Sequence, residues 1–227
     1  MKKLFITGTD TGVGKTYIGH NLVKALISAG HSCEPRKPIE TGCVINEGEL
    51  IPADASLYVQ ATQDQSTLAQ ICPYRYQPPI SPERAIRLNN DTVTVHDLVE
   101  VCQPVHDAEI LLVEGAGGFY SPLCSDGLNA DLAQQLDADI ILVAEDRLGC
   151  INQILLTLEA IQNRKLNTLA VVLNQIRKQE TSFMNNFEDL GRLIDIPIIA
   201  ITNISTPSQA DLNNPHQAIE KILTLLS

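Results

Sequence analysis

The stretch that decides the fold is Leu4-Phe5-Ile6-Thr7-Gly8-Thr9-Asp10-Thr11-Gly12-Val13-Gly14-Lys15-Thr16, near the start of the chain. It begins with a short apolar run typical of a buried strand, and a helical period of apolar residues follows it. The loop between them consists of small residues, so consecutive backbone N–H groups can point inward beside a helix N-terminus and cradle phosphate. The stretch therefore predicts a phosphate-binding loop between a strand and a helix.

Lys15 and Thr16 stand where a nucleotide-binding loop has the lysine that reaches the β- and γ-phosphates and the hydroxyl that binds Mg²⁺. The strict pattern G-x-x-x-x-G-K-[ST] requires glycine at position 9, but Thr9 stands there and the first glycine is Gly8. The alternative is a glycine-rich turn with a surface lysine, and the flanking strand and helix favour the phosphate loop. Asp10 occupies the place of the signature lysine of switch ATPases that move or partition cargo, which argues against that subclass.

Continuous apolar runs recur along the chain and are typical of strands buried on both faces. Their alternation with helical periods predicts an α/β fold like that of P-loop NTPases, a parallel sheet with helices on both faces, in a single domain over residues 1–227. Ligands of such sheets bind beyond the carboxyl ends of the strands. The further expected strands are 110–113, 140–143, 169–173 and 196–201, and the expected helices include 18–29 and 151–161. The irregular stretch 42–91 is either an inserted active-site excursion or a poorly packed connection.

The composition excludes several classes of protein. Sixteen basic and 27 acidic residues give a net charge of −11, which argues against nucleic acid as a partner. Six cysteines occur without a C-x-x-C pair, so structural zinc is not expected. Because no apolar stretch approaches the roughly 20 residues of a membrane span or forms a signal-peptide core, we expect a cytoplasmic protein with reduced thiols.

Three charged residues outside the loop are candidates for phosphate chemistry. Lys37 follows the expected second strand and could stabilise charge on a transferring phosphoryl group, or it is a surface lysine. Asp54 follows Pro52 and Ala53 and is either a metal ligand or a helix cap. Glu114 ends an apolar run and precedes Gly115-Ala116-Gly117-Gly118, a place that suits Mg²⁺ coordination, or it is a carboxylate at the edge of a tight turn.

Five segments together resemble the dethiobiotin synthetase family in order and spacing. They are Gly8-Thr9-Asp10-Thr11, Val13-Gly14-Lys15-Thr16, Lys37-Pro38, Val113-Glu114-Gly115-Ala116-Gly117-Gly118 and Leu148-Gly149-Cys150-Ile151-Asn152, so the resemblance covers about residues 1–175. It implies an ATP-dependent cyclo-ligase that makes dethiobiotin, ADP and phosphate from 7,8-diaminononanoate, CO₂ and ATP. In the family, a carbamate is formed and phosphorylated, and the neighbouring amine then closes the ureido ring.

The resemblance also implies a role for each matching residue. The expected catalytic residues are Lys15 and Lys37, which would flank the carbamate and the γ-phosphate, and Thr11. Mg²⁺ would be held by Thr16, Asp54 and Glu114. ATP contacts are expected from Gly12, Val13, Gly14, Lys15, Thr16, Tyr17, Asp54, Glu114, Gly115, Ala116, Gly117, Asn174 and Gln175. Asn174 matches an asparagine that reads adenine, although by itself it could be a strand-end turn residue. Substrate contacts are expected from Thr41, Leu148, Gly149, Cys150 and Asn152.

In the family, the segment 148–152 belongs to the other subunit, so the resemblance implies a homodimer. Three positions depart from the family pattern: Gly12 replaces a glutamate of several members, Glu83 replaces a frequent histidine, and 202–205 has no good match near the expected nucleobase. One rival is a related ATP-dependent enzyme that amidates corrin rings, but 227 residues leave little room for its glutamine-hydrolysing domain. A second rival, a nucleotide switch or metallochaperone, would need the missing lysine at position 10 or a cysteine pair.

Overall fold

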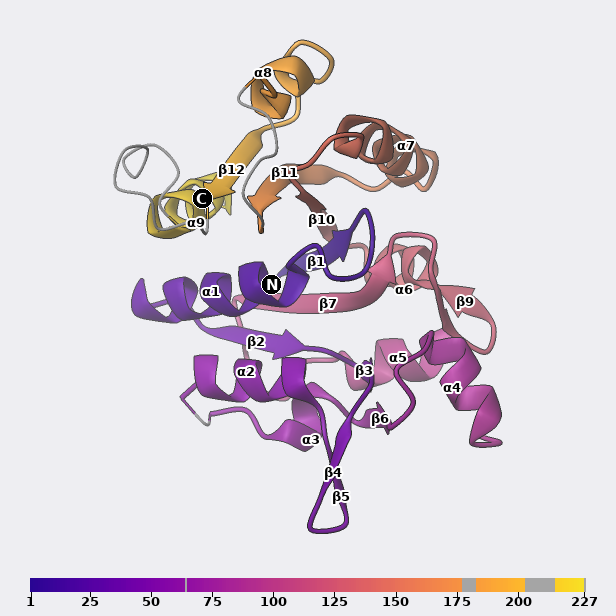
Figure 1. The fold of residues 1–227 in the computed structure, drawn as a ribbon. Coiled ribbons are helices and arrows are strands. Elements are labelled where there is room, and N and C mark those ends of the chain that lie inside the picture. The colour runs from indigo at the N-terminus through magenta and orange to yellow at the C-terminus, as the bar shows by residue number, and fades with distance from the viewer. Residues whose placement is uncertain (64, 177–182, 203–214, 227) are drawn as a thin grey trace.

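The centre of the molecule is a parallel β-sheet (Figure 1). The computed structural model describes residues 1–63, 65–176, 183–202 and 215–226, and within these ranges six strands form the sheet in the order β12-β11-β10-β1-β7-β2. The strands are β1 (Lys2–Gly8), β2 (Cys33–Arg36), β7 (Ile110–Gly118), β10 (Asp139–Glu145), β11 (Thr168–Gln175) and β12 (Ile198–Thr202). All five pairings between them are parallel, as the alternation of apolar runs and helical periods predicted.

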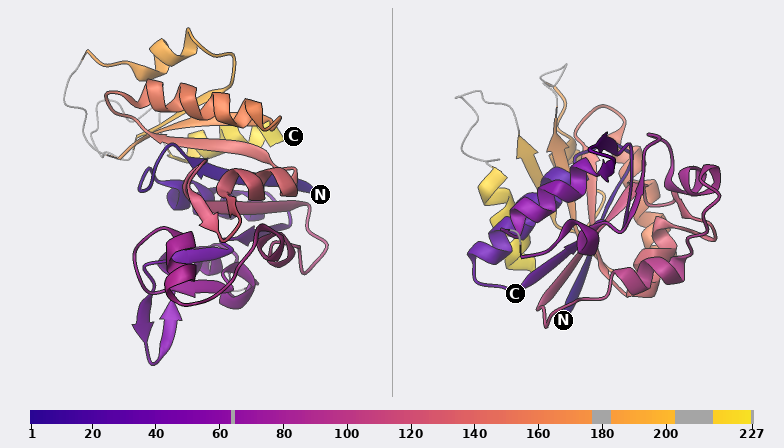
Figure 2. Two further views of the ribbon diagram at one scale, coloured as in Figure 1. Left: turned by 90° about the vertical axis from the view of Figure 1, so that its right-hand side faces the viewer. Right: turned by 90° about the horizontal axis from the view of Figure 1, so that it is seen from below.

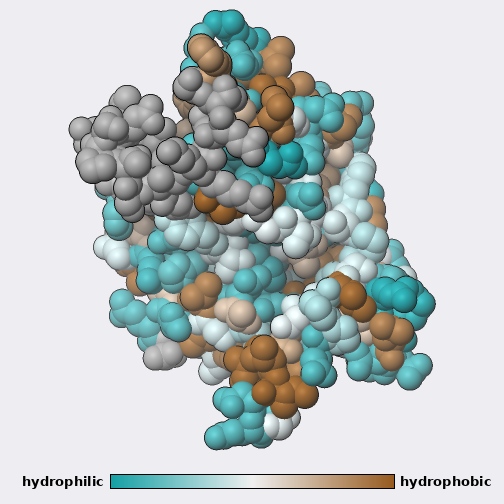
Figure 3. All heavy atoms as spheres, in the orientation of Figure 1, coloured by the Kyte–Doolittle hydropathy of each residue, from teal (hydrophilic) through white to brown (hydrophobic). Residues whose placement is uncertain are grey.

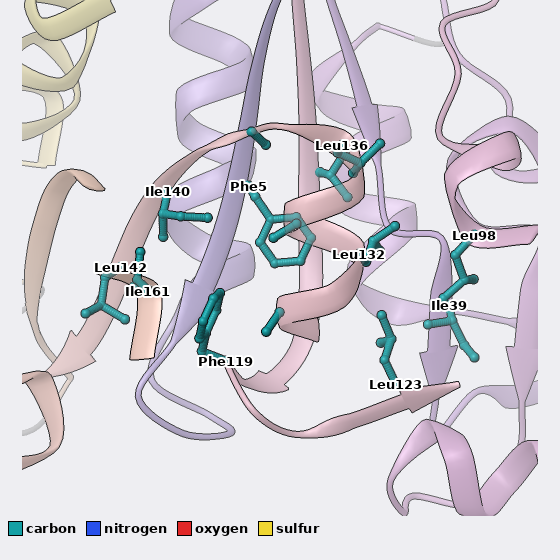
Figure 4. Close-up of a cluster of buried hydrophobic side chains, with 14 of the residues drawn as sticks. Phe5, Ile39, Leu98, Phe119, Leu123, Leu132, Leu136, Ile140, Leu142 and Ile161 are labelled. Atoms are coloured by element: carbon teal, nitrogen blue, oxygen red, sulfur yellow. The ribbon is translucent and has the colours of Figure 1, made fainter. Parts of the chain in front are cut away.

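Helices cover both faces of this sheet (Figure 2). Neighbouring residues of a strand point to opposite faces, so Leu4 and Ile6 of β1 join the core beneath one helical layer while Phe5 joins the other (Figure 4). One layer contains α1 (Lys15–Ser28), α2 (Ala53–Ala61), α3 (Leu68–Ile71) and α9 (Pro215–Leu226). The other contains α5 (Val95–Val101), α6 (Asn129–Leu136), α7 (Cys150–Asn163) and α8 (Asn186–Gly191). The predicted α/β fold is confirmed.

Several observed strands extend one or two residues beyond the predicted ranges, and the boundaries of β7 and β12 differ for reasons that the structure shows. β7 continues through Glu114 to Gly118, because Gly118 pairs with Gly8 beyond a register shift in β1. Glu114 and the glycine-rich segment that follows it therefore belong to strand β7, and Glu114 does not stand at the edge of a tight turn. β12 begins at Ile198, two residues later than predicted, because Pro197 has no N–H for the ladder and contributes its carbonyl to Val171 instead.

The stretch 42–91 is built from short elements beside the sheet. With β3 just before it, these are β3 (Ile39–Thr41), β4 (Val44–Asn46), β5 (Glu49–Ile51), α2, α3, β6 (Tyr74–Tyr76) and α4 (Pro82–Leu88). β4 and β5 form an antiparallel hairpin that projects from the body of the molecule (Figure 1). Val44 and Ile45 of this hairpin are more than half exposed, and apolar surface is visible in the corresponding region of the space-filling view (Figure 3). A second small hairpin joins β8 (Pro122–Cys124) to β9 (Gly127–Leu128). Among the described residues, no helix is long and apolar enough to cross a membrane.

Candidate active site

A cavity of about 640 Å³ lies at the carboxyl ends of β1 and β7. The stretch 42–91 forms part of its wall, through Asp54 and the segment from Pro79 to Pro82, which favours the interpretation of this stretch as an active-site excursion. The cavity brings together many of the predicted site residues, namely Thr11, Gly12, Gly14, Lys15, Thr16, Lys37, Thr41, Asp54, Glu114, Ala116 and Gly117.

The loop between β1 and α1 wraps around its own lysine. Lys15 is buried, and its Nζ donates a hydrogen bond to the backbone oxygen of Asp10 at 2.9 Å. Gly14 has a φ angle of 97°, a backbone conformation that residues with a side chain rarely adopt. A Cβ there would also lie 2.1 Å from Nδ2 of Asn174. Glycine at this position therefore allows the loop to lie directly against β11.

Two buried cations, Lys15 and Lys37, line the same cavity. Burial and, second to it, the charge of Lys37 together lower the pKa of Lys15 to about 8. Burial also acts to lower the pKa of Lys37, but the carboxylates of Glu114 and Asp54 outweigh it and raise that pKa above its ordinary value. The site thus keeps Lys37 charged and leaves Lys15 with an ammonium that an anion would stabilise.

Lys37 lies between two carboxylates. Its Nζ is 2.5 Å from Oε1 of Glu114 and 3.1 Å from Oδ2 of Asp54, and it also donates to the carbonyl of Gly115 at 3.3 Å. Thr16 donates its hydroxyl to the same Oε1 of Glu114 at 2.8 Å. Glu114 therefore links the phosphate loop on α1 to the lysine that follows β2.

Tyr58 binds the other oxygen of Glu114, and the sequence interpretation did not include it. The buried side chain of Tyr58 donates its hydroxyl to Oε2 at 2.7 Å. Tyr58 follows Asp54 by four residues on α2, a spacing that puts both side chains on one face of a helix. That spacing was the available signal.

Glu40, which the sequence motifs also did not indicate, binds the start of α2. Asp54 lies in the first turn of α2, yet its side chain does not cap the helix. Instead the buried carboxylate of Glu40 accepts the backbone N–H groups of Asp54 at 2.9 Å and Ala55 at 3.0 Å. Burial and the nearby Asp54 raise the pKa of Glu40. This contact fixes the start of α2 against β3 and so helps to fix Asp54 beside Lys37.

Asn129 is a third residue that the motifs did not reveal. It is fully buried at the start of α6, and its side chain exchanges hydrogen bonds with both backbone groups of Ala116 at 2.9 and 2.7 Å. Its amide also donates to the carbonyls of Gly118 and Ser121. Asn129 thus holds the glycine-rich end of β7 in the shape that lines the cavity.

The donor set fits a magnesium ion that shares its coordination with a nucleotide. No group of three His, Cys, Asp or Glu side chains in the described ranges is arranged as a metal site by itself. Asp54 and Glu114 nevertheless meet at one cationic group, and Thr16 adds a hydroxyl oxygen. Mg²⁺ is commonly bound by one or two carboxylates, with phosphate oxygens and water completing its shell, and these three residues suit that arrangement.

Other predicted ATP contacts lie around the loop without lining the cavity. Val13 and Asn174 are buried, and Asn174 donates its amide to the Val13 carbonyl at 3.0 Å. Gly115 offers its carbonyl to Lys37, Tyr17 is on the partly exposed side of α1, and Gln175 ends β11. The segment 203–205, expected near the nucleobase, lies outside the described residues.

The segment 148–152 also lies away from this cavity. Leu148 is 83% exposed, and Gly149 and Asn152 are exposed beside it at the start of α7. Cys150 instead points into the core, and its N–H is donated to the carbonyl of Arg147 at 3.1 Å. Glu83, which stands where the family often has histidine, lies in the first turn of α4, and its carboxylate is 3.2 Å from Nε of Arg87.

The fold and the loop define a P-loop NTPase-like protein. The chain resembles the MinD cell division protein of Aquifex aeolicus with a TM-score of 0.60 and 14% identity, covering 100% of this chain and 97% of that one. It resembles the cell division ATPase MinD of Pyrococcus furiosus with a TM-score of 0.59 and 14% identity, covering 100% of both chains. At this identity the likeness concerns the fold alone.

Sequence relatives identify the family within this class. A family model described as an AAA domain matches residues 2–216. ATP-dependent dethiobiotin synthetase BioD of Vesicomyosocius okutanii subsp. Calyptogena okutanii is 39% identical over 98% of this chain and 97% of its own length. The same-named protein of Aeromonas salmonicida is 34% identical over 93% of this chain and 95% of its own. The chain therefore belongs to the dethiobiotin synthetase family, whose members are ligases.

Proposed function

We propose that this cavity binds ATP, 7,8-diaminononanoate and CO₂ and closes the ureido ring of dethiobiotin, releasing ADP and phosphate. The observation that carries the proposal is the meeting of a phosphate-binding loop with two buried ammonium groups, Lys15 and Lys37, at one cavity. Relatives named ATP-dependent dethiobiotin synthetase support the choice of reaction.

The proposed reaction has three steps. An amine of the substrate adds to CO₂ and loses a proton, which gives a carbamate. A carbamate oxygen attacks the γ-phosphorus of ATP, and the bond from that phosphorus to the bridging oxygen breaks with ADP as the leaving group. The neighbouring amine attacks the carbonyl carbon of this mixed anhydride, loses its proton and expels phosphate as the ring closes. These steps gather anionic oxygens, so the protein must supply positioning and charge neutralisation.

The two lysines suit different parts of this task. We assign Lys15 to the ATP phosphates, because it follows the phosphate loop, lines the cavity and has a pKa lowered by burial and by the charge of Lys37, so that a bound anion would stabilise its ammonium. We assign Lys37 to the carbamate and the γ-phosphate, because it lines the same cavity and the carboxylates of Glu114 and Asp54 keep it charged. Thr11 and Thr41 would hydrogen-bond the diamine or the carbamate. The Thr41 hydroxyl donates to the carbonyl of Ile80 at 2.8 Å and keeps its oxygen free to accept an N–H.

The remaining assignments concern the metal and the nucleotide. Thr16, Asp54 and Glu114 would hold Mg²⁺, which when bound neutralises charge on the phosphates. Asn174 and Gln175 would face the nucleobase from the end of β11.

We further propose a homodimer in which Leu148, Gly149, Cys150 and Asn152 of one subunit contact the substrate held by the other. This proposal rests on the resemblance of the segment to the dethiobiotin synthetase family, and the exposure of Leu148 at the start of α7 leaves the segment accessible to a second subunit. Sedimentation at working concentration tests the dimer, and a monomer with full activity would contradict it. The cytoplasmic location expected from the sequence stays a prediction.

The reaction is tested directly by supplying the diamine, bicarbonate and MgATP and looking for the cyclic urea by mass spectrometry. We expect ADP release that depends on the diamine. Diamine-independent ATP hydrolysis without a cyclic product would indicate a nucleotide switch and overturn the proposed function.

A further inference from the structure

The Glu114 carboxylate has two oxygens with separate surroundings. Oε1 accepts hydrogen bonds from Lys37 and Thr16, both of which line the cavity. Oε2 accepts the hydroxyl of Tyr58, which is completely buried and does not line the cavity. Rotation of the Glu114 carboxylate about its last side-chain bond would exchange Oε1 and Oε2. The hydrogen bond from the Tyr58 hydroxyl to Oε2 opposes this rotation.

Tyr58 is itself held by the element that carries Asp54. Both residues lie on α2, whose first backbone N–H groups are bound by the buried carboxylate of Glu40. The position of the Tyr58 hydroxyl is therefore linked to the same wall that presents Asp54 to Lys37. One short helix sets the geometry of both carboxylates.

Gly19 provides an independent observation. It lies within α1, where glycine is less stable than alanine by roughly 0.5–1 kcal/mol. A Cβ at this position would lie 1.9 Å from the Tyr58 hydroxyl and 3.0 Å from Cζ of the same ring. The absence of a side chain at Gly19 is what allows the tyrosine to pass beneath α1 and reach Glu114.

We propose that Tyr58 is a positioning residue that holds Glu114 with Oε1 directed toward Lys37 and Thr16. This inference rests on the proposed metal-binding role of Glu114. Groups that orient a metal ligand from behind typically change metal affinity by about 10- to 100-fold when removed. Tyr58 acts through Glu114 and contacts neither substrate nor nucleotide.

Tyr58→Phe tests this proposal, because it keeps the ring and removes only the hydroxyl. Calorimetry of ADP binding with Mg²⁺ and with a chelator separates the metal-dependent part of the affinity. We expect the affinity with Mg²⁺ to fall about 10-fold and the metal-free affinity to change less than about twofold. The matched control is Tyr76→Phe, since Tyr76 is also buried and its hydroxyl is directed to Asp91. We expect no change in Mg²⁺ dependence for this control.

Gly19→Ala gives a second route to the same question. In the wild-type background its methyl group displaces the Tyr58 hydroxyl, so we expect the same loss of Mg²⁺-dependent affinity. In the Tyr58→Phe background the nearest clashing atom is gone, and we expect Gly19→Ala to cause no further loss.

Two outcomes would count against this account and can be told apart. If Tyr58→Phe lowers the unfolding midpoint but leaves the Mg²⁺ dependence unchanged, Tyr58 has a structural role only and the inference is wrong. If ADP binding to the wild-type chain does not depend on Mg²⁺ at all, the metal-binding role of Glu114 fails and the inference fails with it.

Discussion

Lys37 combines near-complete burial with contacts to Glu114 and Asp54, and few lysines keep their charge in such surroundings. Those two carboxylates lie on different elements, β7 and α2, so the fold assembles the environment of this ammonium from distant parts of the chain. An anionic substrate in the cavity would compete with the carboxylates for it.

We expect Lys37→Ala to lower turnover by at least about 100-fold, the typical loss when one preorganised donor to a developing anion is removed. ATP affinity should change by less than about threefold, because in the proposed arrangement most phosphate contacts come from Lys15 and the loop backbone. Product formation and calorimetry measure the two effects, with Lys24→Ala on the exposed side of α1 as control. Near-normal product formation by Lys37→Ala would show that its assignment is wrong.

The lowered pKa of Lys15, about 8, predicts a pH effect on nucleotide binding. Below that pH the free protein already carries the ammonium, and above it binding of phosphate must take up a proton. We therefore expect metal-free ADP affinity to fall by up to about tenfold per pH unit above about pH 8. Lys15→Arg keeps its charge throughout this range, so its affinity should stay nearly constant. If ADP affinity fell equally with pH in the wild-type protein and in Lys15→Arg, the assignment of Lys15 to the phosphates would be contradicted.

The sequence predicted those site residues whose neighbours along the chain indicate their role. Lys15 and Glu114 each adjoin a strand and a glycine-rich segment, so their places at one edge of the sheet follow from the topology. Glu40 and Tyr58 act on partners 14 and 56 positions away. The spacing of Tyr58 from Asp54 indicated only a shared helix face, and the contacts of Tyr58 and Glu40 depend on how α2 docks, which no local pattern contains.

At the scale of elements, the start of α2 is bound by the carboxylate of Glu40. Glu40→Ala would leave the N–H groups of Asp54 and Ala55 without their acceptor, and Ala55 is fully buried. We expect a loss of about 1–3 kcal/mol in the free energy of unfolding. Urea denaturation measures it, and Glu49→Ala on the exposed strand β5 is the control. Equal unfolding midpoints for the two variants would show that Glu40 does not anchor α2.

The long strands and helices were predictable because each carries its own period of apolar residues. The elements within 42–91 were not, since β3 pairs with β6 and β4 with β5 in segments of only three residues. The end of β7 was misjudged for a related reason. Glycines usually mark turns, but here Gly118 pairs with Gly8, and the neighbouring strand decides the conformation.

At the scale of the whole molecule, all six cysteines are buried free thiols. Burial raises the pKa of Cys33, Cys102 and Cys124 to about 12, which suppresses the reactive thiolate. We expect a disulfide reagent at neutral pH to label none of them rapidly in the native protein and all six in urea. Timed labelling followed by mass spectrometry checks this. Rapid labelling of a native thiol would place that cysteine in a more open environment than described.

These raised pKa values also concern stability at alkaline pH. A folded-state thiol that keeps its proton above the ordinary pKa of about 9 binds a proton that the unfolded chain releases. The stabilisation is present below about pH 9 and is lost as the pH rises toward the folded value. The buried thiols thus contribute to destabilisation at alkaline pH.

In the proposed reaction, a carbamate is phosphorylated within the cavity that Lys15 and Lys37 line. The most direct test supplies ¹⁸O-labelled bicarbonate with unlabelled water, the diamine and MgATP, and analyses the released phosphate by mass spectrometry at short times. Because a carbamate oxygen attacks phosphorus and leaves with it, we predict one ¹⁸O atom in each phosphate formed together with dethiobiotin. Dethiobiotin formed together with unlabelled phosphate would contradict the claim.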